Sequence, residues 1–343
     1  MFDFIPNTYF LFAFGLILLI KGGDWFVDAA TSIAHRFGLP ELLIGATVVS
    51  IGTTLPEVMT SAMAAMGGSG EIAYGNAIGS IICNTSLIAA LTIAIKPGKA
   101  DKRSMLFPVA CFFSVAVFYA LNAYIAGEFK LWAGIVLLAC FVVYMTITVI
   151  NMKRGSAQEP VAEALTENAV EDRPATEESG SKLSLVKDIL VLLGSAIVIA
   201  LGAHLLVNSA TEIAESLGIP ESVIALTVVA LGTSLPELVT AITSLMKGHG
   251  ALSLGNIIGA NIFNLVLVSG VAITINPFTV PMTSSLFGAN TSLVLDVPVM
   301  FAVMALLTVP TLLRGRLARW QGISLLAIYA AFLVMQFVFV VPV

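Results

Sequence analysis

Two glutamates, Glu57 and Glu237, each close a short motif that lies inside a long apolar segment. The motifs are Gly-Thr-Thr-Leu-Pro-Glu at 52–57 and Gly-Thr-Ser-Leu-Pro-Glu at 232–237. A carboxylate at membrane depth costs free energy unless it has a partner, so an ionisable residue there predicts a functional site. Because the setting is duplicated, we expect a cation site between two halves of a transporter.

The residues around each glutamate supply further oxygen atoms. Thr53 and Thr54 precede Glu57 by four and three positions, a spacing that places the three side chains on one face of a helix. Pro56 lacks an N–H and displaces the carbonyl of Gly52, and free carbonyls at membrane depth persist only where they face a cavity or a ligand. The second motif repeats this arrangement with Thr233, Ser234, Pro236 and Glu237.

A second polar segment follows each motif. Ser80 and Asn84 are four residues apart in the first segment, and the matching positions of the second hold Ala260 and Asn264. Both segments contain Gly-Asn-x-x-Gly, whose small residues allow helices to approach closely and whose asparagines could hydrogen-bond between helices. A set of ligands made only of oxygen suits hard cations such as Ca²⁺, Na⁺ or Mg²⁺, whereas zinc and copper prefer imidazole and thiolate.

Apolar helices must position these residues. The 343 residues are 58% hydrophobic and 11% charged, and apolar runs of about 20 residues, long enough to span a bilayer, follow one another along the chain. We therefore predict an all-α polytopic membrane protein with ten transmembrane helices, at about 8–33, 40–66, 72–95, 105–123, 130–151, 185–208, 219–246, 251–275, 291–312 and 319–341. The sequence has no basic stripe for nucleic acid, no ATP-binding motif and no nucleophile–base set that would indicate an enzyme.

The two halves of the chain are internal repeats. Twelve of the 21 residues in 38–58 are identical at an offset of 180. Each half holds five spans, an odd number, so the second half must enter the membrane from the opposite side; this predicts inverted repeats at 1–151 and 185–343. The segment 152–184, rich in Glu, Ala, Ser and Pro, is predicted to be a disordered linker between them.

The distribution of charge predicts the orientation. Fourteen of the 16 Lys and Arg residues lie in or beside the loops after the odd-numbered spans. The positive-inside rule therefore places the linker in the cytoplasm and both termini outside. Among other polar residues, Lys21 and Asp24 are expected to pair within one helix, and Asp296 is expected to be solvated near the outer end of its span.

The paired motifs resemble the repeats of the cation/Ca²⁺ exchanger superfamily, specifically its prokaryotic sodium/calcium exchanger branch. The resemblance implies ten helices in two inverted five-helix repeats, located in a prokaryotic plasma membrane, with Ca²⁺ and Na⁺ competing for the two motif glutamates. The metal ligands that it implies are Glu57, Glu237, Thr53, Thr233, Thr54, Ser234, Ser50, Ala230, Ser80, Asn84 and Asn264.

The sequence departs from this family pattern in two places. Ala260 stands where a hydroxyl is expected, so one Na⁺ ligand is missing. Asn264 stands where K⁺-dependent relatives carry Asp, which leaves two carboxylates that one Ca²⁺ would neutralise and argues against K⁺ co-transport. Gly79 and Gly259 occupy positions where the proton/calcium branch has Glu, which disfavours H⁺ as the coupling ion.

The sequence thus predicts a secondary antiporter that exports Ca²⁺ using inward Na⁺, without a cofactor, with the two cations and the lipid bilayer as its partners. A cation/H⁺ antiporter is the alternative on the same fold. A passive cation channel and a membrane-embedded ion sensor are less favoured, because inverted repeats are typical of transporters and no sizeable soluble domain could relay a signal. The stoichiometry, the physiological divalent cation and the oligomeric state stay open; a monomer is compatible with the sequence.

Overall fold

A computed structural model describes residues 5–156, 182–216, 232, 234–282, 284–286 and 288–342. Within this part of the chain, nine helical stretches are long and apolar enough to cross a membrane: Thr8–Arg36, Glu41–Met66, Gly70–Ile95, Lys102–Ala126, Leu131–Met152, Leu185–Ala210, Gly250–Ile275, Ser292–Arg314 and Arg319–Phe339. A shorter apolar helix, α11 (Leu235–Met246), follows the described part of the second glutamate motif. These stretches match the predicted spans to within a few residues, except that the first part of span 219–246 lies outside the described residues.

The first half of the chain contains seven α-helices, three π-helical segments and one short strand. In chain order these are α1 (Ile5–Arg36), α2 (Glu41–Ile44), η1 (Gly45–Val49), α3 (Ser50–Met66), α4 (Gly70–Cys83), η2 (Asn84–Ala89), α5 (Ala90–Ile95), α6 (Lys102–Leu121), η3 (Asn122–Ala126), β1 (Glu128–Phe129) and α7 (Leu131–Ser156). Several spans are therefore composite, with a π-helical segment inside or at the end of the α-helix.

The described elements of the second half follow a related order. They are α8 (Lys182–Ser216), α11, α12 (Gly250–Phe263), η7 (Asn264–Val268), α13 (Ser269–Ile275), β2 (Phe278–Thr279), β3 (Ser284–Leu286), β4 (Ala289–Asn290), η8 (Ser292–Asp296), α14 (Val297–Arg314), α15 (Arg319–Val334), η9 (Met335–Phe339) and β5 (Val340–Pro342). The strands are only two or three residues long, so the architecture is helical as predicted.

Local sequence explains several helix ends. The side chain of Asp101 accepts hydrogen bonds from the backbone N–H groups of Arg103 and Ser104 and so caps the start of α6. Gly127 and Gly315 both have φ of 68°, a left-handed conformation that suits glycine and ends η3 and α14.

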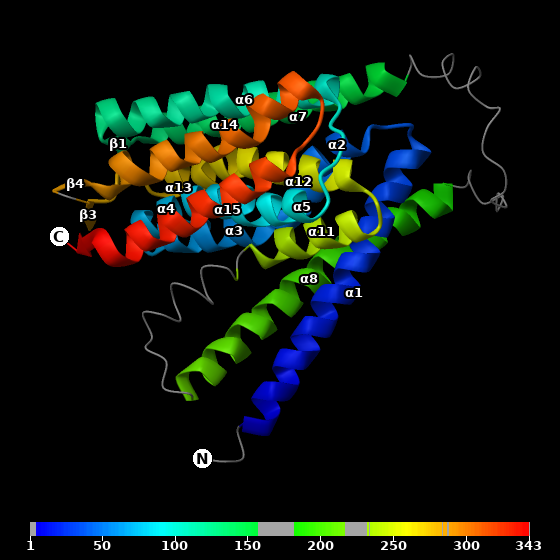
Figure 1. The fold of residues 1–343 in the computed structure, drawn as a ribbon, viewed down its shortest axis with the longest axis horizontal. Coiled ribbons are helices and arrows are strands. Elements are labelled where there is room, and N and C mark those ends of the chain that lie inside the picture. Colours follow the sequence, from blue (N-terminus) through cyan, green and yellow to red (C-terminus); the bar gives the residue numbers. More distant parts are fainter. Residues whose placement is uncertain are drawn as a thin grey trace.

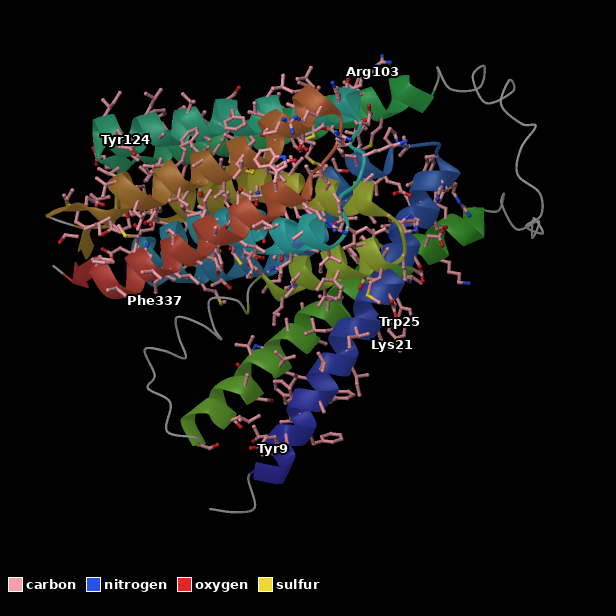
Figure 2. All side chains as sticks on the ribbon, viewed as in Figure 1. Tyr9, Lys21, Trp25, Arg103, Tyr124 and Phe337 are labelled. Carbon is pink, nitrogen blue, oxygen red and sulfur yellow. The ribbon has the colours of Figure 1, made fainter. Side chains whose placement is uncertain are left out.

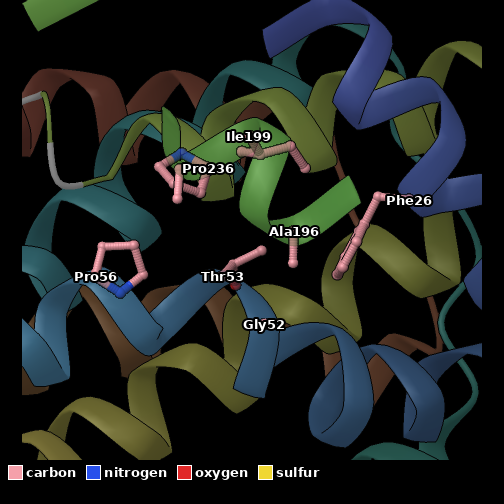
Figure 3. Close-up of a pocket in the computed structure, with 8 residues that line it drawn as sticks. Phe26, Gly52, Thr53, Pro56, Ala196, Ile199 and Pro236 are labelled. Carbon is pink, nitrogen blue, oxygen red and sulfur yellow. The ribbon is translucent and has the colours of Figure 1, made fainter. Parts of the chain in front are cut away.

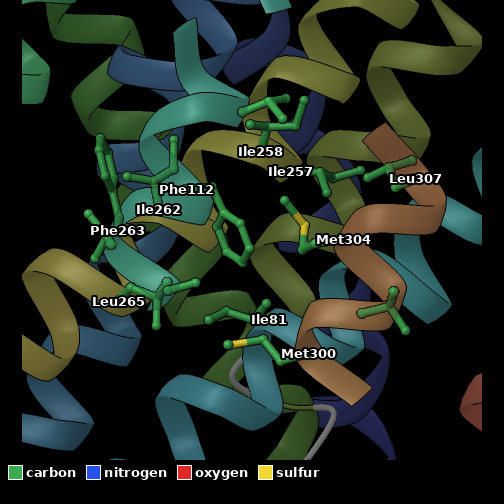
Figure 4. Packing of buried hydrophobic residues seen from close by; sticks show 14 of the residues in the cluster. Ile81, Phe112, Ile257, Ile258, Ile262, Phe263, Leu265, Met300, Met304 and Leu307 are labelled. Atoms are coloured by element: carbon green, nitrogen blue, oxygen red, sulfur yellow. The ribbon is translucent and has the colours of Figure 1, made fainter. Parts of the chain in front are cut away.

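The two halves of the chain interleave. Helix α1 packs along α8, α7 packs against α13, α5 against α15, and α2 and η1 against α12, so each of these contacts joins one half to the other. The main hydrophobic core contains Ile81 and Phe112 from the first half beside Ile257 and Met304 from the second (Figure 4).

Glycines permit close contacts of α12 with α2 and with the start of α3. A Cβ on Gly255 would lie 2.0 Å from the carbonyl oxygen of Leu42, and one on Gly259 would lie 2.3 Å from Oγ of Ser50. Only glycine fits at this distance, which confirms the close approach predicted from the second Gly-Asn-x-x-Gly motif. Gly75 is the equivalent of Gly255 in the first half. Its expected contact is residue 222, the equivalent of Leu42 at the offset of 180, and residue 222 lies outside the described residues.

The α1/α8 pair is set apart from the other helices. The two helices run side by side and slant away from the bundle formed by the remaining spans (Figure 1). Hydrogen bonds join them near both ends: Thr8 Oγ1 donates to Glu212 Oε2 at 2.8 Å, and Ser32 Oγ donates to Asp188 Oδ2 at 2.9 Å. The pair is therefore held together more extensively than it is held to the bundle.

The structure corrects two expectations about charged residues. Asp24 pairs with Lys247 of the other half, at 3.6 Å, and not with Lys21, which is exposed. Asp296 is half-buried, and its Oδ1 accepts a hydrogen bond from Nε2 of Gln336 at 2.7 Å, so it is not simply solvated. In both cases the partner is distant in sequence, which local spacing could not reveal.

Candidate functional site

Helices α3 and α11 bring the two motif glutamates together inside the bundle. Glu57 and Glu237 both have 0% exposed surface, and their charges are close enough to interact. Among the described residues, no group donates a hydrogen bond to any of the four carboxylate oxygens, and no Lys, Arg or His side chain forms an ion pair with either glutamate. Each glutamate is thus a buried acid without a protein counter-charge in the described part of the chain.

Four other polar residues predicted for the site also have buried polar atoms without a partner among the described residues. The hydroxyl oxygens of Thr54 and Ser234 are buried and have no hydrogen-bond partner among the described residues. The same is true of the amide groups of Asn84 and Asn264. They come from α3, from the residue that caps α11, and from the first residues of η2 and η7. Most of the buried side chains without a partner in the described chain are therefore the ones that the sequence singles out.

Such a concentration of unpaired groups has a physical meaning. Burying a polar group without a hydrogen bond costs free energy, so native proteins pair nearly all of them. Together the six residues carry eight such oxygen atoms, and a bound cation is one kind of partner that satisfies buried oxygens. Ca²⁺ takes about six to eight oxygen ligands, a number that this set can supply.

Two hydroxyls of the predicted set make protein contacts instead. Oγ of Ser50 donates to the carbonyl oxygen of Gly45 at 2.7 Å or to that of Asn256 at 3.0 Å, and Oγ1 of Thr53 donates to Oδ1 of Asn256 at 3.2 Å. The Thr53 hydroxyl also faces Glu237. Because its proton goes to Asn256, no described residue donates to the Glu237 carboxylate.

The asparagines of the Gly-Asn-x-x-Gly motifs connect to the backbone of the glutamates. Nδ2 of Asn76 donates to the carbonyl oxygen of Glu57 at 3.1 Å. Nδ2 of Asn256 donates to Oγ1 of Thr240 at 3.0 Å, and Thr240 Oγ1 donates to the carbonyl oxygen of Glu237 at 3.0 Å. The prediction that both asparagines form hydrogen bonds between helices is confirmed. That these bonds lead to the backbone carbonyls of the glutamates was not predicted.

The remaining predicted ligands are placed in part. Ser80 is buried on α4, 4% exposed, and Ala260 is fully buried at the matching position of α12. Ala230 and Thr233 lie outside the described residues. Sequence reasoning did not assign Cys83 to the site, although this residue is buried at the end of α4. Its position directly before Asn84 was the available signal.

A small hollow lies between the glutamate motifs and the α1/α8 pair. It is lined by Gly52, Thr53, Pro56, Pro236, Phe26, Ala196, Ile199 and Ala200 (Figure 3). Pro56 lies within α3 and Pro236 in the first turn of α11, so the hollow forms where both motif helices have a proline. A movement of α1 and α8 would therefore change the space beside Thr53.

The sodium/calcium exchanger protein family model matches residues 7–150 and 187–338, which is most of the chain. The chain belongs to this family. This result confirms the resemblance inferred from the motifs and identifies the chain as a membrane protein of a cation-exchange transporter family.

Relatives of this family member are similar to it over nearly their full length. An uncharacterized membrane protein, MJ0091 of Methanocaldococcus jannaschii, is 36% identical, covering 93% of this chain and 94% of the relative. The sodium/calcium exchanger MaX1 of Methanosarcina acetivorans is 34% identical, covering 97% and 99%. A solved structure of the sodium-calcium exchanger NCX_Mj, soaked with Na⁺ and Sr²⁺, has a TM-score of 0.75 and 32% identity, covering 95% of this chain and 98% of that one.

Proposed function

We propose that this protein is a secondary antiporter that exports Ca²⁺ in exchange for inward Na⁺. The observation that carries the proposal is the group of buried, unpartnered oxygen atoms from Thr54, Glu57, Asn84, Ser234, Glu237 and Asn264. The names of the relatives MaX1 and NCX_Mj, both sodium/calcium exchangers, support the choice of ions. Ser50, Thr53, Ser80, Ala230 and Thr233 complete the proposed set, with Ser50, Thr53, Ala230 and Thr233 contributing carbonyl oxygens.

In this mechanism Ca²⁺ and Na⁺ compete for the same two carboxylates. Glu57 and Glu237 repel each other when no cation is present, and their burial in a medium of low dielectric strengthens that repulsion. One Ca²⁺, or Na⁺ ions in its place, neutralises the pair. The change between the two sides of the membrane is then favourable only when a cation occupies the site. The protein therefore exchanges one ion for the other and does not let ions leak.

The proposal includes the arrangement of the chain in the membrane. Ten helices form two inverted five-helix repeats in a prokaryotic plasma membrane, with both termini outside and 152–184 as a cytoplasmic linker. The α1/α8 pair slides along the bundle to expose the site to each side in turn. Its slant and its many contacts within the pair support this role (Figure 1).

Flux measurements in proteoliposomes test the proposed function. Vesicles loaded with Na⁺ and diluted into Na⁺-free buffer should take up Ca²⁺, and Glu57→Gln or Glu237→Gln should reduce that uptake to background, because Gln keeps the shape and removes the charge. Glu128→Gln is the matched control, since Glu128 is exposed and pairs with Lys130 at 2.9 Å, away from the site.

The outcomes separate the alternatives. Uptake that ignores the Na⁺ gradient but follows a proton gradient would replace Na⁺ by H⁺ as the coupling ion. Uptake without any counter-ion would indicate a channel. Full activity in both glutamine variants would contradict the site itself, whichever ion drives transport.

A further inference from the structure

Seven basic residues gather at one end of the bundle. They lie on or beside two loops that are far apart in the sequence, one around Lys99 and one around Arg316. We call this group the basic platform; it consists of Lys96, Lys99, Lys102, Arg103, Arg314, Arg316 and Arg319, all of them exposed. Figure 2 marks Arg103 at this end of α6 and Tyr124 at the opposite end of the same span. Each half of the chain contributes one of the two loops.

Backbone hydrogen bonds hold the two loops together. Lys99 and Arg316 form an antiparallel bridge, the N–H of Ala100 donates to the carbonyl oxygen of Gly315 at 3.1 Å, and the N–H of Leu317 donates to that of Gly98 at 2.9 Å. The platform is thus a fixed arrangement of charges rather than two independent loops.

No carboxylate of the described residues lies within ion-pair distance of the platform, although the charge of Arg103 acts on the neighbouring Asp101. The acid nearest in sequence is Asp101, which caps α6; burial acts to raise its pKa, but hydrogen bonds from Ser104 and Arg103 hold that pKa below its usual range. The cations repel one another, so an anion bound there would stabilise the platform.

Apolar side chains next to the platform place it at the surface of the bilayer. Ile95, Leu106, Leu313 and Ile323 are 67%, 61%, 74% and 61% exposed, so lipid chains can cover them. The guanidinium of Arg314 lies 5.8 Å from the ring centre of Trp320, which is 43% exposed. Tryptophan beside arginine at the edge of an apolar surface is typical of the headgroup level.

A cavity opens between the platform and the bundle. Lys96, Gly98 and Lys99 line it on one side, and Gly250 and Ser253, in the first turn of α12, line it on the other. The start of a helix carries partial positive charge and favours anions. Two lysines and the start of a 14-residue helix therefore face the same space.

We propose that the basic platform is a binding site for anionic phospholipid. The headgroup phosphate lies at the cavity beside Lys96 and Lys99, and the acyl chains lie along the exposed apolar side chains of Ile95 and Ile323. A lipid fits better than a soluble anion because the charged and apolar surfaces are continuous. Clustered Lys and Arg next to membrane helices attract anionic headgroups. This inference requires only that the chain spans a membrane, and not a particular transported ion.

Quenching of Trp320 fluorescence by brominated lipid tests the proposal in the full-length protein. A Trp25→Phe, Trp132→Phe background leaves Trp320 as the only tryptophan of the chain. At equal mole fraction, dibrominated phosphatidylglycerol should occupy the site at least about fivefold more than dibrominated phosphatidylcholine, the preference that one engaged basic residue provides. Removing the cavity and platform charges with Lys96→Gln, Lys99→Gln and Arg316→Gln should abolish the preference.

Matched controls make the result decisive. A protein that retains only Trp132 should show no preference, because the nearby Lys130 already pairs with Glu128 at 2.9 Å. Equal quenching of Trp320 by the two lipids would overturn the proposal, and so would a preference that survives the triple substitution. Loss of the preference on adding inorganic phosphate at millimolar concentration would show a soluble-anion site instead. These readouts do not depend on transport, so they remain informative if Na⁺/Ca²⁺ exchange fails.

Discussion

At the scale of single residues, the two halves of the candidate site differ most clearly at one position. Ser80 in α4 corresponds to Ala260 in α12 at the offset of 180, and both are buried. Asn84 and Asn264, four residues later, are by contrast the same residue in the same π-helical position. The second half therefore provides one hydroxyl oxygen fewer at this position, where we propose that Na⁺ binds.

Ala260→Ser should restore that oxygen. We expect half-maximal exchange at a several-fold lower Na⁺ concentration, with little change in the Ca²⁺ dependence, because the two carboxylates proposed to hold Ca²⁺ are untouched. The measurement is Ca²⁺ uptake as a function of internal Na⁺, with Ala272→Ser, a fully buried position of α13, as the control for added volume. An unchanged Na⁺ dependence would show that position 260 does not contact Na⁺.

Sequence spacing predicted part of this site and could not predict the rest. The polar atoms of Glu57, Glu237 and Asn84 are buried and unpaired, as an intramembrane ligand requires. The hydroxyl of Thr53 instead donates to Asn256, which is more than 200 positions away, and the hydroxyl of Ser50 lies between carbonyl oxygens of Gly45 and Asn256. The spacing within a helix shows which residues share a face, but it does not show what packs against that face.

At the scale of elements, the asparagines begin matching irregularities. Asn84 starts η2 and Asn264 starts η7, where the helix widens to π-helical hydrogen bonding. Such segments often mark functional sites, because they re-aim side chains and free backbone groups. Hydrophobic spacing predicted the spans well but gave no sign of these segments, because one extra residue in a single turn does not change the apolar pattern of a span.

The contact between α2 and α12 can be tested with one added methyl group. Gly255→Ala would place Cβ 2.0 Å from the carbonyl oxygen of Leu42, so the backbones must move apart. We expect a loss of about 1–3 kcal/mol or more in the free energy of unfolding, measured as thermal unfolding in detergent.

Gly194→Ala on α8 is the matched control for the change in composition. No described atom lies within 4 Å of a Cβ there, so the higher helix propensity of alanine should make that variant as stable as the parent or up to ~1 kcal/mol more stable. Similar unfolding temperatures for Gly255→Ala and Gly194→Ala would contradict the tight contact.

At the scale of the whole molecule, one lysine links the α1/α8 pair to the bundle. Nζ of Lys247, at the end of α11, lies 2.7 Å from Oδ1 of Asp28 and donates to the carbonyl oxygen of Asp24 at 2.9 Å. Asp24 and Asp28 belong to α1, so this ion pair favours the arrangement of α1 described here over one in which α1 has moved along the bundle.

Lys247→Glu should therefore alter the rate of exchange. The pair is partly exposed and contributes about 0–1 kcal/mol, so we expect a change of up to about fivefold. Adding Asp28→Lys to Lys247→Glu restores opposite charges and should return the rate toward the parent value. The control exchanges the charges of Glu128 and Lys130, which form an ion pair with each other and not with α1 or α8. A double variant no better than the single one would exclude this role.

The interleaving of the two halves has a consequence for synthesis of the protein. Helices α5 and α7 pack against α15 and α13, and η1 packs against α12, so the first half lacks its packing partners until the second half has been made. Between the end of α5 at Ile95 and the end of α15 at Val334 the ribosome adds more than 200 residues, on the order of tens of seconds of translation. During that interval the helices of the first half must be inserted in the membrane with buried polar groups such as the Thr53 hydroxyl still without their partners, in this case Asn256 of the second half. The nascent chain is then most exposed to membrane proteases, and chaperones that shield polar helices would act at this stage.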